Sequence, residues 1–178
     1  MPTTSNTTPK LRAPKPLYPM HVVLVEPEIP PNTGNIARLC GATGSTLHLV
    51  GTLGFRIDDA SVRRAGLDYW HLVEIFTHKD FSAFLEHFNS LGSGGRLHLF
   101  SGLGRQSYLH RGFRPGDALV FGKESVGLPQ ELLDAYPADV VAIPMPGAVR
   151  SLNLSNAVAI GLYDALRQSG GLDRTEFR

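Results

Sequence analysis

The sequence has very little cysteine and no long apolar run. Its 178 residues include one cysteine, Cys40, which excludes a disulfide framework within the chain and suits a reducing compartment. No apolar run reaches the roughly eighteen residues that a membrane helix needs, and residues 1–19 lack the apolar block of a signal peptide. We therefore expect a cytoplasmic protein with one domain, which is long enough to form its core without metals or disulfides.

Acidic residues are absent from two stretches of the chain. Residues 1–19 are rich in Pro and Thr and carry three basic residues, so we expect a flexible basic tail. The segment 87–116 also lacks acids, and its basic residues are Arg96, Arg105, Arg111 and Arg114. Because the planar guanidinium suits phosphate recognition, these arginines indicate either a nucleic-acid surface or an ordinary solvated loop.

Short apolar runs alternate with helix-like segments. Several runs are apolar on both faces, which is typical of a parallel sheet covered by helices on each side. The predicted strands are 21–26, 46–51, 71–76, 96–101, 118–122 and 139–144. The predicted helices are 32–43, 80–91, 129–136 and 152–168, with a further candidate at 58–65. The pattern predicts a single α/β domain over residues 20–170, followed by a C-terminal tail, 171–178.

Several common site motifs are missing. The stretch "GLGRQS" (102–107) lacks the third glycine of a dinucleotide fingerprint, and "FGKES" (121–125) lacks the spacing of a phosphate-binding P-loop. There is no serine-hydrolase elbow. The seven histidines follow no metal-binding spacing, and single strand histidines such as His48 and His98 are usually core or surface residues. We expect no metal site.

The last predicted helix carries small residues at a spacing of four, namely Ala157, Gly161 and Ala165. Small residues let another backbone approach closely, because side chains at the contact set the distance between helix axes. The stripe therefore fits a subunit interface or an intrachain packing face equally well.

Three stretches place polar groups directly after predicted strands. In the first, Asn32 or Thr33 can cap the helix that carries Arg38. The second is a tight glycine loop that bears Glu124. The third offers more capping groups than one helix needs, since one side-chain oxygen is usually enough: Ser151, Asn153, Ser155 and Asn156. Loops at the carboxyl ends of parallel strands bind ligands in α/β folds, so these residues predict a ligand site without naming the ligand.

At these stretches the chain resembles the SPOUT superfamily of knotted RNA methyltransferases. "NTGNIARLC" (32–40), "FGKESVGLP" (121–129) and "IPMPGAVRSLNLSNAVAIGLYDALR" (143–167) match its three motifs in order and spacing. Together with "RIDDASVRRAGLDYW" (56–70), they are most similar to the TrmL (YibK) group, which methylates the wobble ribose of leucine tRNAs. The resemblance covers nearly the whole chain apart from its tails.

The resemblance implies a six-stranded parallel sheet with a trefoil knot in the C-terminal third. It also implies a homodimer, S-adenosylmethionine as the cofactor, and transfer of its methyl group to the ribose 2'-oxygen of the wobble nucleotide, C or modified U. The tRNA would lie across the dimer and contact the arginines above together with Arg63 and Arg64.

The same resemblance implies the site residues. Those matched to catalysis are Asn35, Arg38, Ser151 and Asn153, and those matched to cofactor binding are Phe100, Gly122, Glu124, Ile143, Ser151 and Asn156. Because a guanidinium keeps its proton, we expect Arg38 to hold a phosphate and the developing alkoxide instead of acting as a base. One departure is Lys123, which stands where many relatives have proline or another small residue.

Three alternatives remain at this stage. A 2'-O-methyltransferase for another tRNA site or for ribosomal RNA would share the same motifs. A non-catalytic RNA-binding relative is disfavoured by the presence of Arg38, Ser151 and Asn153. A nicotinamide oxidoreductase is disfavoured by the missing third glycine after Gly104.

Overall fold

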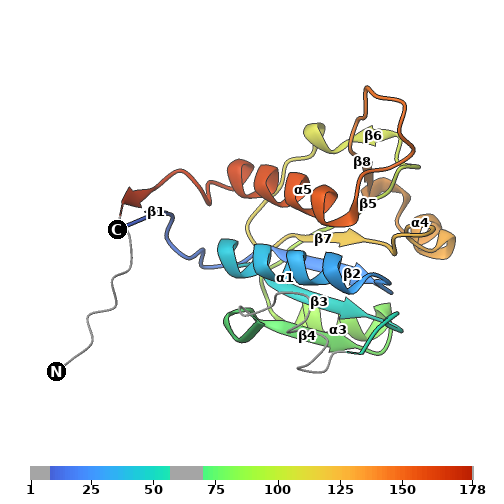
Figure 1. Ribbon diagram of the computed structural model, residues 1–178, viewed down its shortest axis with the longest axis horizontal. Coiled ribbons are helices and arrows are strands. Elements are labelled where there is room, and N and C mark those ends of the chain that lie inside the picture. The colour runs from blue at the N-terminus through green and yellow to red at the C-terminus, as the bar shows by residue number, and fades with distance from the viewer. Residues whose placement is uncertain (1–8, 57–69, 178) are drawn as a thin grey trace.

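A parallel β-sheet flanked by helices forms the centre of the computed structural model, which describes residues 9–56 and 70–177 (Figure 1). The sheet has seven strands in the spatial order β4-β3-β2-β7-β5-β8-β6, and all its pairings are parallel. The strands are β2 (His21–Val25), β3 (Thr46–Val50), β4 (Ile75–His78), β5 (Leu97–Phe100), β6 (Gln106–Ser107), β7 (Ala118–Phe121) and β8 (Val140–Ala142). The predicted α/β class is confirmed.

The predicted number of six strands is wrong by one. The extra strand, β6, is two residues long and pairs with the outer edge of β8 through Gln106 and Ser107. It lies in the glycine-rich connection 102–117, where so short a strand leaves no periodic pattern in the sequence. β4 also begins four residues later than expected, because Trp70–Leu72 forms a short 3-10 helix instead of extended chain.

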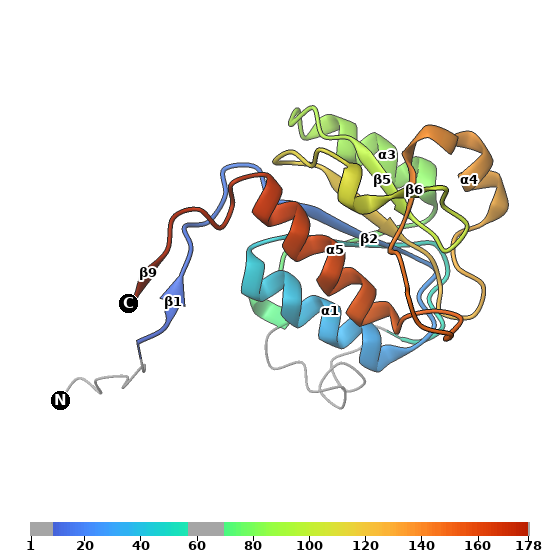
Figure 2. The same cartoon turned by 90° about the horizontal axis from the view of Figure 1, so that it is seen from above.

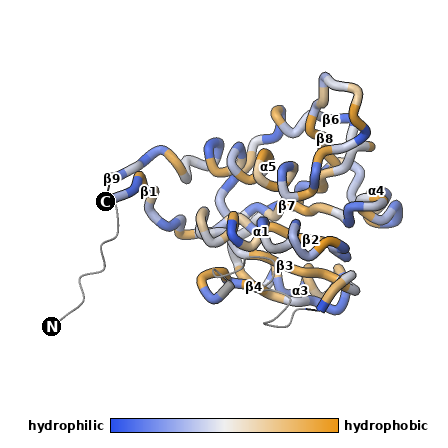
Figure 3. Tube along the Cα trace, in the orientation of Figure 1, coloured by the Kyte–Doolittle hydropathy of each residue, from blue (hydrophilic) through white to orange (hydrophobic). Residues whose placement is uncertain are grey.

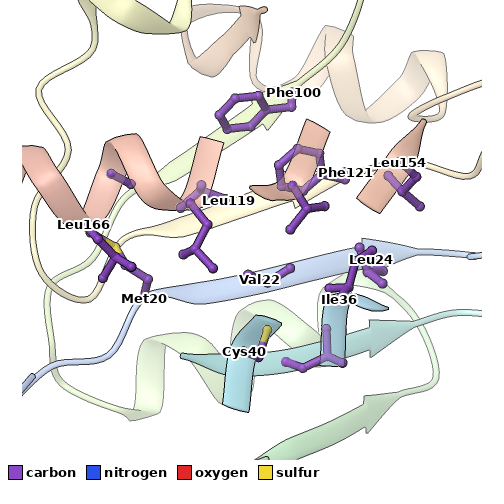
Figure 4. Close-up of a cluster of buried hydrophobic side chains, with 14 of the residues drawn as sticks. Met20, Val22, Leu24, Ile36, Cys40, Phe100, Leu119, Phe121, Leu154 and Leu166 are labelled. Carbon is purple, nitrogen blue, oxygen red and sulfur yellow. The ribbon is translucent and has the colours of Figure 1, made fainter. Parts of the chain in front are cut away.

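Alternate strand residues face two separate apolar layers. The helices α1 (Pro30–Thr43) and α5 (Leu154–Gln168) cover one face, while α3 (Phe81–Ser90) and α4 (Gln130–Ala135) cover the other (Figure 2). In β2, Val22 and Leu24 pack under α1 and α5, whereas Val23 and Val25 pack on the opposite side. Figure 4 shows the first layer, and Figure 3 shows apolar residues along the central strands. Both faces of these strands are thus buried, as their sequence predicts.

The starts of the helices explain part of the sequence pattern. Asp80 caps α3 by accepting a hydrogen bond from the Ala83 amide at 2.8 Å. The cap expected at Asn32 or Thr33 is wrong, because α1 begins two residues earlier at Pro30, and its N-cap residue Ile29 offers no side-chain bond. Proline favours this first position because its missing N–H would have no partner there. The Asn32 side chain is therefore available for another role.

The last helix returns to the middle of the sheet. β8 lies near one edge, yet α5 packs against α1 and β7, so residues 143–153 cross back past the ends of β5 and β7. The predicted knot requires such a return. Within α5, Gly161 and Ala165 are buried, and a Cβ on Gly161 would lie 2.9 Å from the Phe100 ring. These two small residues form an intrachain packing face.

The ends of the described chain, at residues 11–12 and 176–177, lie side by side, away from the sheet (Figures 1 and 2). β1 (Leu11–Arg12) pairs antiparallel with β9 (Glu176–Phe177), which the sequence did not predict. Within residues 9–56 and 70–177, no helix is both long and apolar enough to cross a membrane. The candidate helix 58–65, with Arg63 and Arg64, falls outside the described residues.

Candidate nucleotide and methyl-transfer site

One pocket lies at the carboxyl ends of the central strands. It has a volume of about 630 Å³, which is in the range of pockets that hold small organic ligands. Its walls are the loops that follow β2, β5, β7 and β8, so all three polar stretches singled out in the sequence reach it. The expectation that these stretches meet at one edge of the sheet is confirmed.

Most of the predicted site residues line this pocket, and three do not. The residues in its wall are Phe100, Gly122, Glu124, Ile143, Ser151 and Asn153. Asn35 and Arg38 are exposed in the second and third turns of α1, Asn156 is exposed in the first turn of α5, and none of the three is in the pocket wall. Their placement fits contact with a second molecule better than enclosure of a small ligand.

A chain of hydrogen bonds joins the three polar stretches. The Asn32 amide nitrogen donates to Oε1 of Glu124 at 2.9 Å, and its oxygen accepts from Nδ2 of Asn153 at 3.0 Å. Glu124 also accepts from the Glu28 amide at 2.9 Å and from the Ile29 amide at 3.3 Å. Asn32 is therefore central to the site, although its sequence position suggested only a helix cap.

The polar groups at the start of α5 have two roles, since some cap the helix and others line the pocket. Oδ1 of Asn153 accepts from the amides of Ser155 and Asn156 and from the Ser155 hydroxyl, so one residue supplies the whole cap. Its Nδ2 remains for Asn32. Ser151 is exposed and faces the pocket. The surplus of capping groups in the sequence thus serves both the helix start and the pocket wall.

The floor of the pocket is apolar and tightly packed. The rings of Phe100 and Phe121 stack with centroids 4.6 Å apart, and Gly161 lets α5 lie directly on Phe100. Gly122 also leaves no room for a side chain, because a Cβ there would lie 2.0 Å from the carbonyl carbon of Gly127. This close approach keeps the 122–127 loop folded on itself as a wall of backbone groups.

These residues fit the cofactor that the resemblance implies. A nucleoside needs a flat apolar slot and backbone groups for its polar edges, and Phe100, Gly122 and Ile143 supply both kinds of contact. Polar side chains in the same lining, Glu124, Ser151 and Asn153, suit the sugar and the charged end of such a ligand. The walls also leave room for a ligand of that size.

Two of the four arginines in the acid-free segment belong to the scaffold. Arg96 pairs with Asp117 at 3.0 Å, and Arg111 pairs with Asp139 at 2.9 Å. Arg105 and Arg114 are exposed. The segment therefore offers fewer cations to a nucleic acid than its composition suggests.

The histidines lie away from the pocket. A hydrogen-bonded row across β2, β3 and β4 consists of the buried His21 and His48 and the half-buried His78, and His98 bonds to Asp117. Among the residues that the structure describes, no group of three or more His, Cys, Asp or Glu side chains is arranged to hold a metal ion.

Sequence comparison places the chain among RNA-modifying enzymes. The model of the SpoU rRNA methylase family matches residues 19–163. A tRNA (cytidine(34)-2'-O)-methyltransferase of Burkholderia pseudomallei is 48% identical over 84% of this chain and 96% of its own length. The enzyme of the same name from Escherichia coli K12 is 47% identical over 85% of this chain and 94% of its own.

Solved structures give the same result. A structure concerned with 2-OH methylation of C/U34 on tRNA superposes with a TM-score of 0.78 at 47% identity, covering 85% of this chain and 96% of that one. An AdoMet-bound rRNA methyltransferase from Sinorhizobium meliloti gives 0.72 at 26% identity, covering 84% of this chain and 56% of that one. The three motif loops, their shared pocket and these matches show that the chain belongs to the SpoU methylase family of SPOUT methyltransferases.

Proposed function

We propose that this protein transfers a methyl group from S-adenosylmethionine to the ribose 2'-oxygen of the wobble nucleotide of tRNA. The observation that carries this proposal is that the three motif loops meet around one pocket in a chain nearly half identical, over nearly their full length, to enzymes named for this reaction. The AdoMet-bound structural neighbour supports the cofactor.

The finer parts of the proposal concern the tRNA and the oligomer. We propose leucine tRNAs as substrates and a homodimer as the active form, in the cytoplasm. Ile160 and Tyr163 support the dimer, since both are large apolar residues exposed on α5, at 38% and 49%. They lie on the helix that borders the pocket, so a second copy seated there would adjoin the site.

Positioning is the main contribution that the protein can make to this reaction. The cofactor would supply an activated methyl group on a sulfonium. The 2'-oxygen would bond to this carbon in line as the sulfur–carbon bond breaks, with the thioether leaving and the hydroxyl proton passing to solvent. The wall residues Ser151 and Asn153 stand at the pocket side of α5, where they can orient a ribose. Arg38, exposed on α1, would hold the neighbouring phosphate with its guanidinium group and stabilise the developing alkoxide.

The test is methylation of leucine tRNA that lacks the wobble modification. Purified protein is incubated with this tRNA and methyl-labelled S-adenosylmethionine, and nuclease fragments are analysed by mass spectrometry. We expect label on the ribose of the wobble nucleotide. Label at another tRNA position would keep the chemistry and overturn the target, and no label on any RNA would favour a non-catalytic binder.

Ribosomal RNA is the second candidate substrate, because the family model and the Sinorhizobium meliloti neighbour are both named for rRNA methylation. The same assay with ribosomal RNA distinguishes the two. Transfer to ribosomal RNA with none to tRNA would replace the tRNA proposal.

A further inference from the structure

The loop after β7 is fastened to the loop after β2 by three successive residues. Lys123 donates from Nζ to Oε2 of Glu26 at 2.9 Å. Ser125 donates from its amide and its hydroxyl to the two carboxylate oxygens of Glu28, both at 3.0 Å. Glu124, between them, accepts the hydrogen bonds of the β2 loop described above. We call the residues Glu26, Glu28, Lys123, Glu124 and Ser125 the loop clasp.

The clasp lies beside the cofactor pocket and determines the position of one wall. The 122–127 loop lines the pocket throughout, and the Gly127 amide closes it by donating to the Lys123 carbonyl at 2.9 Å. A loop closed in this way moves as one unit. Its position against the pocket therefore depends on what holds it from outside, which is the β2 loop together with one 3.5 Å hydrogen bond from the Arg150 guanidinium to the Ser125 carbonyl.

Glu26 has a backbone conformation that few residues adopt. Its φ is +50°, and it is the only described residue other than glycine with a positive φ. Such a conformation is strained for a residue that carries a side chain, and it persists only where the surroundings hold it. The Lys123 ion pair and the neighbouring Gly51, whose Cβ would lie 3.0 Å from the Glu26 side chain, are such surroundings.

The positive charge of Lys123 offsets the negative charges of the glutamates in the loop clasp. Three carboxylates, those of Glu26, Glu28 and Glu124, meet in this region, and Lys123 is the cation among the five clasp residues. The hydrogen bond and the charge of Glu26, together with the charge of Glu28, raise the pKa of Lys123. Without the ammonium group, like charges would push the two loops apart.

We infer that Glu26 and Lys123 are positioning residues for cofactor binding, which act by holding the 122–127 loop against the β2 loop. The inference rests on the proposed function, since it takes S-adenosylmethionine as the ligand. In this chain the Lys123–Glu26 ion pair would hold the loop in place, whereas a proline at position 123 would hold it by restricting the backbone. The cofactor affinity of this chain would accordingly depend on ionic strength, because a partly exposed ion pair is screened by salt.

The test measures the dissociation constant for S-adenosylmethionine by calorimetry, on the full chain and without RNA. Lys123→Met and Glu26→Gln should each weaken binding about fivefold, the upper end for a partly exposed pair. The double variant should be no weaker than either single one, because both changes break the same contact. Lys123→Arg should restore binding to within about twofold of the unmodified chain.

The matched control is Lys79→Met, because the Lys79 side chain follows the edge strand β4, is 82% exposed and lies 4.0 Å from Asp80, with no contact to the loop clasp. It should bind the cofactor as the unmodified chain does. Raising the salt concentration should weaken binding by the unmodified chain more than binding by Lys123→Met. Hydrogen exchange provides a readout without cofactor, since the Ser125 amide should exchange faster in Lys123→Met.

The outcomes separate the two proposals. Cofactor binding that is unchanged in Lys123→Met, or additive losses in the double variant, would overturn the inference and leave the proposed function intact. Failure of the unmodified chain to bind S-adenosylmethionine would overturn both.

Discussion

Gly122 is the residue at which the pocket tolerates least change. We expect Gly122→Ala to abolish cofactor binding, because its Cβ would lie 2.0 Å from the Gly127 carbonyl carbon, well inside van der Waals contact. The 122–127 loop would have to open. Calorimetric titration with S-adenosylmethionine measures the effect, and we expect at least a hundredfold loss of affinity, equivalent to about 3 kcal/mol.

Gly147→Ala is the matched control for this prediction. Gly147 lies in the 143–153 loop of the same site, and no atom stands within 4 Å of the Cβ that it would carry. Its affinity for the cofactor should stay within about twofold of the unmodified chain. Normal binding by Gly122→Ala would show that the loop can adopt another closed form.

The role of Asn32 in the site could not be predicted from the sequence. An asparagine near a helix start is an ordinary cap, but the partners of Asn32 stand 92 and 121 residues further along the chain. Such contacts depend on the order of the strands in the sheet, and the local sequence pattern carries no information about that order. Glu124 and Asn153 could be selected in advance because they belong to motifs, whereas the bond between Asn32 and both of them could not.

Among the elements, the connection from β5 to β7 depends on one buried carboxylate. Asp117 is 1% exposed in its side chain and precedes β7. Its Oδ1 accepts from the Arg96 amide, and its Oδ2 accepts from the Arg96 guanidinium, His98 and the Arg114 amide. Burial by itself would raise the pKa of Asp117, but the hydrogen bonds from His98 and from Arg96 and Arg114 lower it to about 2.

We expect Asp117→Asn to lower the free energy of unfolding by about 3 kcal/mol, as when one partner of a buried ion pair is removed. An amide NH₂ in place of Oδ2 would face three donors. Asp139→Asn, at the partly exposed pair with Arg111, should cost less than about 1 kcal/mol. Denaturant titration compares the two, and equal losses would contradict this account.

The long elements were predictable and the short ones were not. Runs such as 21–25 and 118–121 are apolar on both faces, so the pattern located them to within a residue. β1, β6 and β9 have two residues each and are set by what lies next to them in space. Edge pairing of this kind has no periodic signal.

At the scale of the whole molecule, the row of three histidines makes stability depend on pH. Nδ1 of His21 lies 2.9 Å from Nε2 of His48, and Nδ1 of His48 lies 3.0 Å from Nε2 of His78. Glu74 and His87 are the other titratable groups that act on the row. Burial lowers the pKa of His21 to about 4 and that of His48 to about 2, and it also lowers the pKa of His78.

The unfolded chain therefore takes up protons that the folded chain does not. Since the folded pKa values lie below the unfolded value of 6.5, stability is complete above pH 6.5 and is lost as the pH falls below it. At pH 5 the loss should be about 2 kcal/mol for each strongly shifted histidine.

Urea denaturation between neutral pH and pH 5 measures this loss. His21→Asn should reduce the pH dependence, because it removes one of the groups, whatever it does to stability at neutral pH. His110→Asn should leave the dependence unchanged, since His110 is exposed. A free energy of unfolding that is flat over this range would contradict the prediction.

The order of the strands was beyond the reach of sequence physics. Composition and periodicity predicted a parallel sheet with helices on both faces. They did not predict that β4 and β5, which are neighbours in the sequence, are separated in the sheet by β3, β2 and β7. The chain path came from resemblance alone, because general rules treat knotted connections as rare exceptions. The function could not be predicted from composition and periodicity either, because they indicated a ligand site but not its ligand.

The walls of the pocket come from loops more than a hundred residues apart, since Asn32 must meet Asn153. A nascent chain on the ribosome cannot assemble this site until Asn153 has been synthesised. Contacts so distant in sequence also form slowly. The ability to bind a nucleotide should thus be one of the last properties that a newly made molecule acquires, and a ligand that binds only the finished form stabilises that form alone.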